Sequence, residues 1–472
     1  MTVREFAERF MLNLPFEPTP QQTTLVAALS RFVGGEPPGR AAFVLNGYAG
    51  TGKTSVVSAL VRTLREIGAP TVLLAPTGRA AKVFSSMAGQ APYTIHRRIY
   101  RHTVTGAVSM NVNSLSHAIF IVDEASMIGD EPGHATGASL LDDLLEFVYS
   151  GDNCRLILLG DTAQLPPVGL SVSPALDVMR LKQAGLRVSR AQMTSVVRQD
   201  SNSGILLNAT HLRRQMERPP LPKPRFKVRG LDDIKVVEGH ELADEVATAY
   251  ARDGVENTIL ITRSNRAATA ANMTIRSSVL YSEEELCRGE RLLVVKNNYL
   301  WTKPSEGLDF VANGDMATLT AIHSTEQLHG FRFADVTLML THLDLEIDCK
   351  IVLDALVSDT PALPPESFAR LWESRLAALP PDWTKSQKMR ALKTDPYLNA
   401  LQVKYAYAVT CHKSQGGQWE NVMVDMSGLT MPADAPDEAE AAMLTMYRWL
   451  YTSFTRATRR LYLINPPEES LH

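Results

Sequence analysis

Short apolar runs alternate with helical stretches over the first 190 residues of the chain. The runs are rich in leucine or β-branched residues, end in small or turn-forming residues, and cover 42–46, 71–75, 118–122 and 155–160. Continuous apolar strands separated by helices are typical of a buried, doubly wound parallel sheet. A further run at 258–262 predicts a second sheet of this kind, to which residues 421–425 and 460–464 return.

The stretch from residue 286 to residue 400 has a different character. It shows strand-like alternation at 291–295, 316–319 and 335–340, and proline-rich breaks at 361–365 and 380–381. Proline is unfavourable inside helices and central strands alike. We therefore predict a small inserted β domain in a chain of the α/β class.

Composition and cysteine content narrow the class of protein. The chain has 472 residues, 45% of them hydrophobic, and a net charge of −3, which excludes a fibrous or wholly disordered protein. Its four cysteines lie far apart without a CxxC pair, which argues against a zinc ribbon, an iron–sulfur site or a disulfide framework. No apolar run reaches the ~18 residues of a membrane span, and residues 1–16 lack a signal-peptide core. We expect a soluble, cytoplasmic protein with no membrane partner.

Residues 47–54, GYAGTGKT, match the phosphate-loop pattern GxxxxGK[ST]. The apolar run precedes them directly, and a helix is predicted at 55–67. Glycines let such a loop wrap phosphate oxygens with backbone amides at a helix N-terminus, which favours anions. We predict that ATP phosphates bind the backbone of Gly47, Gly50, Thr51 and Gly52. Lys53 would reach the β- and γ-phosphates, and the Thr54 hydroxyl would bind Mg²⁺.

Two further elements follow predicted strands. Asp123 and Glu124 come after the run 119–122, at the carboxyl edge of the sheet, where such folds bind ligands. We predict that Asp123 holds Mg²⁺ and that Glu124 acts as general base toward the attacking water. The segment 160–169, GDTAQLPPVG, places Gln164 beyond a strand end, where it can respond to a γ-phosphate.

Two later motifs complete an ordered set. They are AYAVTCHKSQG at 406–416 and WLYTSFTRA at 449–457. From Thr19 to Arg459 the chain resembles the superfamily 1 helicases of the 5′→3′ translocating 1B branch, which includes RecD-like proteins, Dda and the Pif family. The motifs at 160–169 and 410–416 are more specific than the phosphate loop. They do not separate Dda-like from Pif-like members.

The resemblance implies additional nucleotide contacts. Gln22, in TPQQ at 19–22, corresponds to the residue that reads the adenine edge, and Gly416 would also contact ATP. Arg198 and Arg456 would face the γ-phosphate across a cleft, although Met193-Thr194 replaces the usual leucine–threonine lead into the Arg198 motif. An arginine supplied from another domain makes hydrolysis depend on closure, and such residues contribute about 10³–10⁵ in rate.

The resemblance also implies a set of strand-contacting residues. Such contacts need phosphate-directed donors and stacking or wedge side chains, with little reading of base edges. The residues concerned are Pro76, Thr77, Arg79, Thr94, His96, Pro167, Val168, Ser264, Asn265, Asn313, Thr410, His412 and Lys413. Taken singly, each also fits a helix cap, a turn or a satisfied core polar group.

The implied domain organisation has four parts. Two RecA-like motor domains, 1A and 2A, would cover 1–93 with 117–190 and 191–285 with 401–472. The segment 94–116 contains three arginines and no acid, and it would form a hairpin pin (1B) that turns around Thr105-Gly106. Residues 286–400 would form an SH3-like insert (2B).

The leading functional hypothesis is an ATP- and Mg²⁺-dependent 5′→3′ DNA helicase. Its partners would be single-stranded DNA and 5′-tailed duplex DNA, and we expect it to work as a monomer because no nuclease-like cluster or large N-terminal interaction domain is evident. Two alternatives remain open. One is a DNA-stimulated translocase or ATPase subunit that needs a partner, and the other is a nucleotide-switched DNA-binding module. Intact Glu124, Gln164 and Arg456 argue against the switch.

Overall fold

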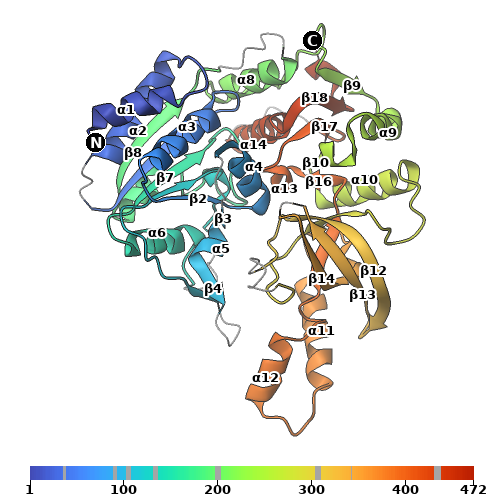
Figure 1. Cartoon of the computed structure of the whole chain (residues 1–472). Coiled ribbons are helices and arrows are strands. Elements are labelled where there is room, and N and C mark those ends of the chain that lie inside the picture. Colours follow the sequence, from blue (N-terminus) through green and yellow to red (C-terminus); the bar gives the residue numbers. More distant parts are fainter. Residues whose placement is uncertain are drawn as a thin grey trace.

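The computed structural model describes residues 1–35, 39–88, 93–102, 108–130, 137–196, 203–302, 310–341, 343–429 and 437–471. Within these residues the strands form two open sheets, a closed barrel and a two-stranded ribbon. Figure 1 shows the first sheet at the left, the second at the upper right and the barrel below the second. We call the six-stranded open sheet with its helices the first unit, and the five-stranded open sheet with its helices the second unit.

The first unit contains a parallel sheet whose strand order differs from the chain order. The order is β3 (Tyr93–Thr94), β2 (Thr71–Ala75), β6 (Ile119–Val122), β7 (Arg155–Gly160), β1 (Ala41–Gly47) and β8 (Arg187–Met193). The four apolar runs predicted as strands are confirmed as β1, β2, β6 and β7. The edge strand β8, RVSRAQM, has no apolar run and was not predicted. It pairs with β1 and carries the sheet past the predicted boundary at 190/191, which is wrong because it cuts this strand.

Helices cover both faces of this sheet. One face packs on α1 (Val3–Leu12), α2 (Pro20–Gly34), α3 (Lys53–Glu66) and α4 (Gly78–Ala88), and the other on α5 (Ile95–Ile99), α6 (Leu140–Ser150) and α7 (Val178–Gln183). In β1, Phe43 and Leu45 face the first set of helices, whereas Ala42 and Val44 face the second. This two-sided burial explains why the strands read as continuous apolar runs.

The second unit repeats the architecture. Its parallel sheet runs β16 (Ala408–Thr410), β10 (Thr258–Thr262), β17 (Trp419–Asp425), β18 (Ala457–Ile464) and β9 (Ile234–Val237), which confirms the predicted return to the sheet. One face packs on α8 (Gly204–Met216), α13 (Cys411–Ser414) and α14 (Asp437–Phe454). The other packs on α9 (Leu242–Asp253), α10 (Asn265–Ser278) and the barrel. Among the described helices, none combines the length and the apolar character needed to cross a bilayer.

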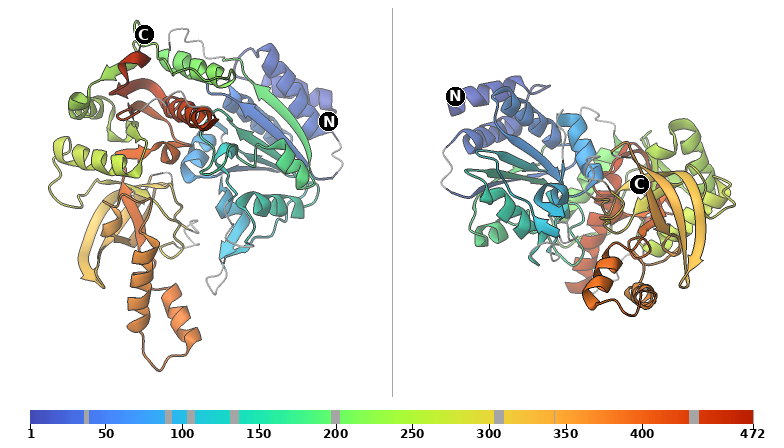
Figure 2. Two further views of the ribbon diagram at one scale, coloured as in Figure 1. Left: turned by 180° about the vertical axis from the view of Figure 1, so that it is seen from behind. Right: turned by 60° about the horizontal axis from the view of Figure 1, so that its bottom comes forward.

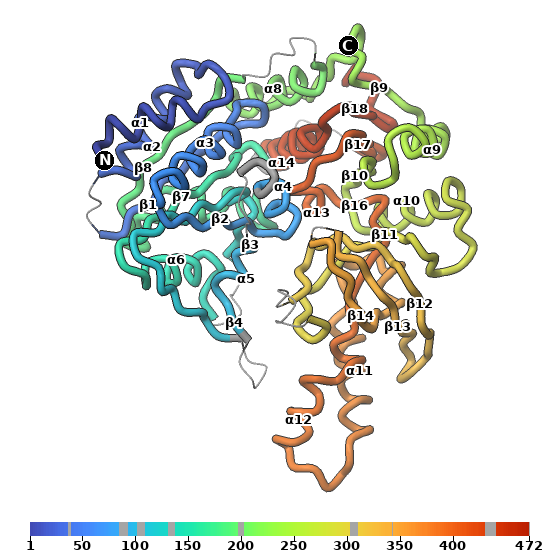
Figure 3. Tube along the Cα trace, viewed as in Figure 1, coloured from blue at the N-terminus to red at the C-terminus, as the bar shows by residue number. Residues whose placement is uncertain are grey.

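The barrel contains β11 (Arg291–Val294), β12 (Met316–Leu328), β13 (Phe331–Leu340), β14 (Leu345–Val352) and β15 (Leu401–Tyr405). A small barrel thus lies in the stretch where a β insert was predicted, but the predicted end of the insert at residue 400 cuts off its last strand. The last strand, β15, pairs with both β11 and β14 and closes the barrel. Residues 405–409, YAYAV, are apolar without a break, so no local signal separates the end of β15 from the start of β16, which belongs to the second unit. Figure 3 traces the chain from α10 through β11, β12, β13 and β14 of the barrel.

A helical arm interrupts the insert, which we expected to be rich in strands. It consists of α11 (Pro365–Ala377) and α12 (Lys385–Lys393) and projects from the barrel (Figures 1 and 2). The prolines that suggested breaks instead start a helix, since Pro365 occupies its first turn, where no N–H donor is needed. Thr384 and Gln387 form a capping box at the start of α12.

A short ribbon stands where the hairpin pin was predicted. Its strands are β4 (Tyr100–His102) and β5 (Val108–Met110), which pair antiparallel, and the predicted turn at Thr105-Gly106 lies outside the described residues. Tyr100 anchors the ribbon to the first unit, because its hydroxyl donates to Asp143 Oδ2 at 2.6 Å in a buried position. The ribbon and the helical arm project from the same end of the molecule (Figure 1).

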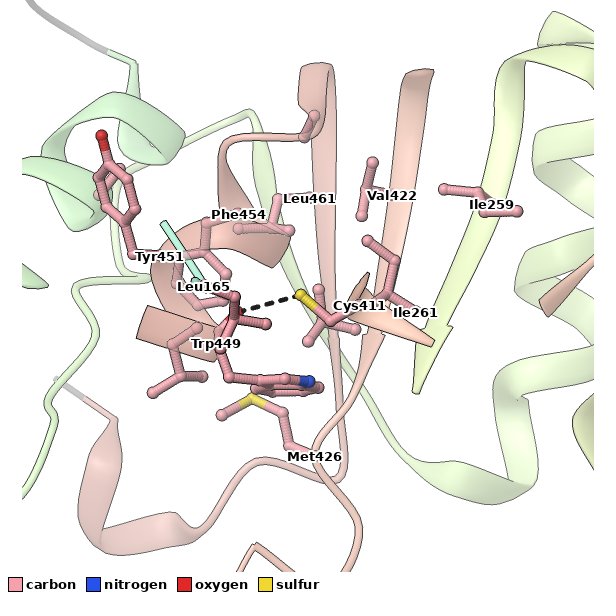
Figure 4. Close-up of a cluster of buried hydrophobic side chains, with 14 of the residues drawn as sticks. Leu165, Ile259, Ile261, Cys411, Val422, Met426, Trp449, Tyr451, Phe454 and Leu461 are labelled. Atoms are coloured by element: carbon pink, nitrogen blue, oxygen red, sulfur yellow. Dashed lines mark hydrogen bonds between the residues drawn. The ribbon is translucent and has the colours of Figure 1, made fainter. Parts of the chain in front are cut away.

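The two units share a hydrophobic core. Ala163 and Leu165, from the loop after β7, are buried among side chains of β10, β17, β18 and α14. Figure 4 shows Leu165 beside Trp449, Phe454 and Cys411, with the Cys411 thiol donating to the Trp449 carbonyl. The loop that follows Asp161 is therefore packed into the second unit rather than into its own.

Candidate functional site

The loop between β1 and α3 has the geometry of a phosphate-binding loop. Gly50 and Gly52 adopt positive φ angles of 76° and 78°, and Gly52 immediately precedes α3. A Cβ atom on Gly50 would lie 2.7 Å from Leu206 Cδ1, and one on Gly52 would lie 2.8 Å from Gln22 Nε2. Both positions therefore require glycine. The amides at the start of α3 border the cleft described next, which is a favourable place for an anion.

A cleft of about 380 Å³ brings together many of the residues predicted to bind and hydrolyse ATP. Its lining includes Gly50, Gly52, Lys53, Thr54, Asp123, Glu124, Asp161, Gln164 and Arg456. The residues of the first unit reach it because β1, β6 and β7 are neighbours in the sheet and end at the same edge. Lys53 Nζ donates to the Gly47 carbonyl at 3.2 Å.

The two adjacent acids differ in their backbone geometry. Asp123 is half-buried in the cleft wall and accepts the Glu124 amide on Oδ1 at 2.8 Å. Burial and the charge of Glu124 raise the pKa of Asp123 to about 6, against the opposing effect of Lys53. Glu124 adopts a left-handed conformation with φ 52°, which is costly outside glycine and is a common mark of functional positions.

Gln164 presents a buried oxygen to this cleft. Gln164 Oε1 accepts no hydrogen bond within the described residues, although the side chain is 6% exposed. A buried acceptor without a donor costs about 1–3 kcal/mol, so it points to a ligand or water that supplies one. Such a partner fits the predicted response to a bound nucleotide.

Arg456 enters the cleft from the second unit. It follows α14, and its guanidinium donates to the carbonyls of Thr452 and Gly417 at 3.1 and 3.2 Å and to Thr455 Oγ1 at 3.3 Å. Arg198, the other predicted arginine, lies outside the described residues. Gly416 does not line the cleft, because it lies against α4, where an added Cβ would meet the Ala80 Cβ at 2.9 Å.

Gln22 is fully buried beneath the phosphate loop. Its Oε1 accepts the Thr19 amide at 3.0 Å, and its Nε2 donates to the Thr51 carbonyl at 3.3 Å. Both ends of the side chain thus hold protein groups, and the adenine contact stays a prediction. Neighbouring Gln21 accepts the amides of Thr194 and Ser195, just before the segment that carries Arg198.

A second cavity of about 190 Å³ lies where the two units and the barrel meet. Thr77 and Arg79 of the first unit, Asn313 of the barrel, and His412 and Lys413 of the second unit all line it. Lys413 Nζ donates to Asn313 Oδ1 at 2.5 Å, and burial lowers the pKa of Lys413 to about 8. The structure therefore brings together five of the predicted strand-contacting residues.

Arg79 spans the two units at this cavity. Its guanidinium lies 3.6 Å from the centre of the Trp419 ring and donates to the Gln418 carbonyl at 3.3 Å. Burial, together with Arg291 and Arg456, lowers its pKa to about 9. Trp419 was not among the predicted residues, because its sequence context is that of a buried strand.

The remaining residues that were predicted to contact the DNA strand do not line this cavity. Thr94 and Ser264 accept amides as N-caps of α5 and α10, and Asn265 begins α10. The His96 ring lies 6.1 Å from the Phe310 ring, and Val168 is 80% exposed beside Pro167. Thr410 ends β16 immediately before α13, and Pro76 lies between β2 and α4.

A residue of the cleft and its partner in the second unit were not among the predicted site residues. Asp161 is buried and accepts a hydrogen bond from the Tyr451 hydroxyl, which reaches it from the second unit. Asp161 lies within the motif at 160–169, so the sequence contained a signal for this residue. No local signal connects it with Tyr451, which is 290 positions away.

Comparison with known families and proteins supports this arrangement. Residues 21–221 match the AAA domain and residues 405–464 match the UvrD-like helicase C-terminal domain. The ATP-dependent RecD2 DNA helicase of Deinococcus radiodurans is 32% identical over 163 residues, which are 34% of this chain and 20% of that protein. The ATP-dependent DNA helicase dda of Enterobacteria phage T4 is 24% identical over 333 residues, which are 64% of this chain and 68% of that protein.

Solved structures of Pif1 helicases are also similar. A Bacteroides Pif1 helicase in complex with ADP-AlF3 and single-stranded DNA has a TM-score of 0.47 at 15% identity, covering 96% of this chain and 93% of that one. The chain spans only a fifth of the length of RecD2. The two domain matches, in this order along the chain, together with the likeness to RecD2 and Dda, show that the chain is similar to superfamily 1B helicases of the RecD type.

Proposed function

We propose that this chain is an ATP-dependent DNA helicase that translocates 5′→3′ on single-stranded DNA and unwinds duplex DNA. The observation that carries the proposal is the composition of one cleft. Lys53, Asp123 and Glu124 of the first unit share it with Arg456 of the second unit. Hydrolysis in such a site depends on how the two units are positioned, which is the requirement for a motor.

The residues at the cleft suit Mg²⁺ with bound ATP. Asp123 and Thr54 would hold the ion, and the raised pKa of the half-buried Asp123 carboxyl fits, because a neighbouring cation would relieve the cost of its desolvated charge. Oxygen donors of this kind are those that Mg²⁺ prefers. When bound, Mg²⁺ neutralises charge on the phosphate oxygens.

The chain's own side chains would divide the remaining chemistry. Lys53 and the loop amides bind the phosphates, and Glu124 accepts the proton of the attacking water. Gln164 would donate or accept a hydrogen bond near the γ-phosphate through its side-chain amide. Arg456 stabilises negative charge in the transition state, and the family resemblance assigns the same role to Arg198.

Strand contact would occur at the cavity between the two units and the barrel. Thr77, Asn313 and Lys413 supply donors of the kind that bind phosphate oxygens. Because the cavity has walls from both units, a change in their separation alters the grip on the strand. The two units would then act as RecA-like motor domains, the barrel as an SH3-like wall of the channel and the β4–β5 ribbon as the pin at the fork.

Two assays on the purified chain test this proposal. ATP turnover with and without saturating oligonucleotide should show strong stimulation by single-stranded DNA, and a 5′-tailed duplex should be unwound while a 3′-tailed one is not. Stimulation without unwinding would favour a translocase subunit that needs a partner. Turnover that does not respond to DNA would favour a nucleotide-switched module. Sedimentation of the active species should give a monomer.

A further inference from the structure

The hydroxyl of Tyr451 connects the second unit to two groups at the nucleotide cleft. It accepts the backbone amide of Ala49, in the phosphate loop, at 2.9 Å, and it donates to Asp161 Oδ2 at 2.7 Å. Tyr451 lies on α14, whereas Ala49 and Asp161 belong to the first unit. One hydroxyl therefore joins the phosphate loop, the end of β7 and α14.

This bridge is shielded from water. Tyr451 and Asp161 are each 1% exposed, and burial raises the pKa of both groups. The other oxygen of Asp161 accepts the Ala163 amide at 2.9 Å. Hydrogen bonds of a buried carboxylate are strong and costly to leave unmade, so the position of the hydroxyl follows that of Asp161. Figure 4 shows Tyr451 at the edge of the hydrophobic cluster to which its ring belongs.

The turn of α14 that carries Tyr451 also connects with the rest of the motor. Thr452 Oγ1 accepts the Leu165 amide at 2.8 Å, and the Leu165 carbonyl accepts from Gln415 Nε2 at 2.7 Å. The Thr452 carbonyl accepts from Arg456 Nε at 3.1 Å. A shift of this turn would thus move Arg456 in the nucleotide cleft and, through Leu165 and Gln415, the wall of the second cavity, which Gln415 lines.

We propose that Tyr451 is a positioning residue that couples the state of the phosphate loop to the grip on the DNA strand. The inference rests on the function proposed above and adds a route for its coupling. Phosphate loops bind their ligand through backbone amides, and Tyr451 holds one such amide directly. Any movement of the loop on nucleotide binding must be accommodated by this hydroxyl, and hence by α14.

The test compares two tyrosines of the same helix. Tyr451→Phe removes the bridging hydroxyl and keeps the ring. Tyr447→Phe is the matched control, because Tyr447 is also 1% exposed on α14 but its hydroxyl donates to the Pro222 carbonyl, away from the cleft. Asp161→Asn weakens the same link from the first unit, so the result does not depend on one variant. Thermal unfolding checks that all three are folded.

The readout is binding rather than turnover. The affinity for a labelled oligothymidylate is measured by fluorescence anisotropy in the absence of nucleotide and with a saturating non-hydrolysable ATP analogue and Mg²⁺. The ratio of the two affinities is the coupling factor, which is about 5–150-fold in allosteric proteins. Neither Tyr451 nor Tyr447 lines the strand cavity, so nucleotide-free DNA affinity should stay within about twofold for both variants.

We expect Tyr451→Phe and Asp161→Asn to lower the coupling factor at least about fivefold, with little further loss in the double variant, while Tyr447→Phe keeps the wild-type factor. A wild-type coupling factor in Tyr451→Phe overturns the inference and leaves the proposed function standing. Equal losses in Tyr451→Phe and Tyr447→Phe also overturn it, because general loosening of α14 would then be the cause. If the wild-type protein does not bind the oligonucleotide, the proposed function fails and the inference fails with it.

Discussion

Asp123→Asn should stabilise the nucleotide-free protein while abolishing ATP turnover. Asp123 is a half-buried carboxyl whose pKa is raised from 3.8 to about 6, mainly by desolvation. When no cation is bound, the ionised form of Asp123 therefore lowers the stability of the folded state. Asparagine has the same shape and can still accept the Glu124 amide, but it carries no charge.

The magnitude follows from the pKa. At about 1.4 kcal/mol per pKa unit, the raised value corresponds to about 3 kcal/mol of lost stability above pH 6. Because the folded state binds this proton more tightly than the unfolded state, the loss is fully present above the folded pKa and shrinks as the pH falls toward the unfolded pKa. Asp123→Asn should therefore gain up to about 3 kcal/mol at pH 8, about half of that at pH 5 and little at pH 4.

Urea denaturation of the metal-free protein at these pH values is the appropriate assay. Asp152→Asn is the control, because the Asp152 side chain is 77% exposed and should change stability by less than about 0.5 kcal/mol. Addition of MgADP should stabilise the wild type more than Asp123→Asn. The reasoning is refuted if Asp123→Asn is less stable than the wild type at pH 8, or if its gain does not depend on pH.

Three further predictions concern activity. Lys53→Ala should nearly abolish hydrolysis, because the negative charge of the β- and γ-phosphates loses its counter-charge. Glu124→Gln should still bind ATP but fail in turnover. Near-normal phosphate release by Glu124→Gln would contradict the role of Glu124 as general base. Stimulation by single-stranded DNA should come with an affinity that falls as salt rises. A titration between 50 and 200 mM salt should show about a 300-fold or larger loss if six or more phosphates of the single strand are contacted. Replacing residues 101–109 by a short Gly-Ser linker should leave DNA-stimulated ATPase within a few-fold but remove most unwinding of a 5′-tailed duplex. Equal losses in the two assays would mean that this segment supports the fold or the strand instead.

The sequence alone predicted the elements whose signals are local. The phosphate loop needs glycines at fixed positions between a strand and a helix, and Gly50 and Gly52 adopt the positive φ angles that this requires. The acids at 123 and 124 were predicted at a sheet edge because an apolar strand precedes them. Asp123 and Glu124 share one cleft with Lys53, because the parallel strands that precede these residues end at a common edge of the sheet.

Other features had weak or misleading local signals. The edge strand β8 is polar because only part of its surface is buried, so it lacks the apolar run of a central strand. Prolines at 364 and 365 suggested a break but begin α11. The end of the barrel at Tyr405 was missed because the apolar run 405–409 joins β15 to β16 without a break, although the two strands have different partners.

What the tertiary structure decided is the set of contacts between residues far apart in the chain. Gln22 could be assigned to a nucleotide motif from its neighbours, but only packing shows its side chain bound to Thr19 and Thr51. The hydroxyl of Tyr451 reaches Ala49 across 402 positions, and no spacing rule in the sequence links the two. A local pattern reflects the conformation of a few consecutive residues, whereas a buried bridge depends on how two separately formed sheets pack against each other, and that geometry is set by all the side chains between them.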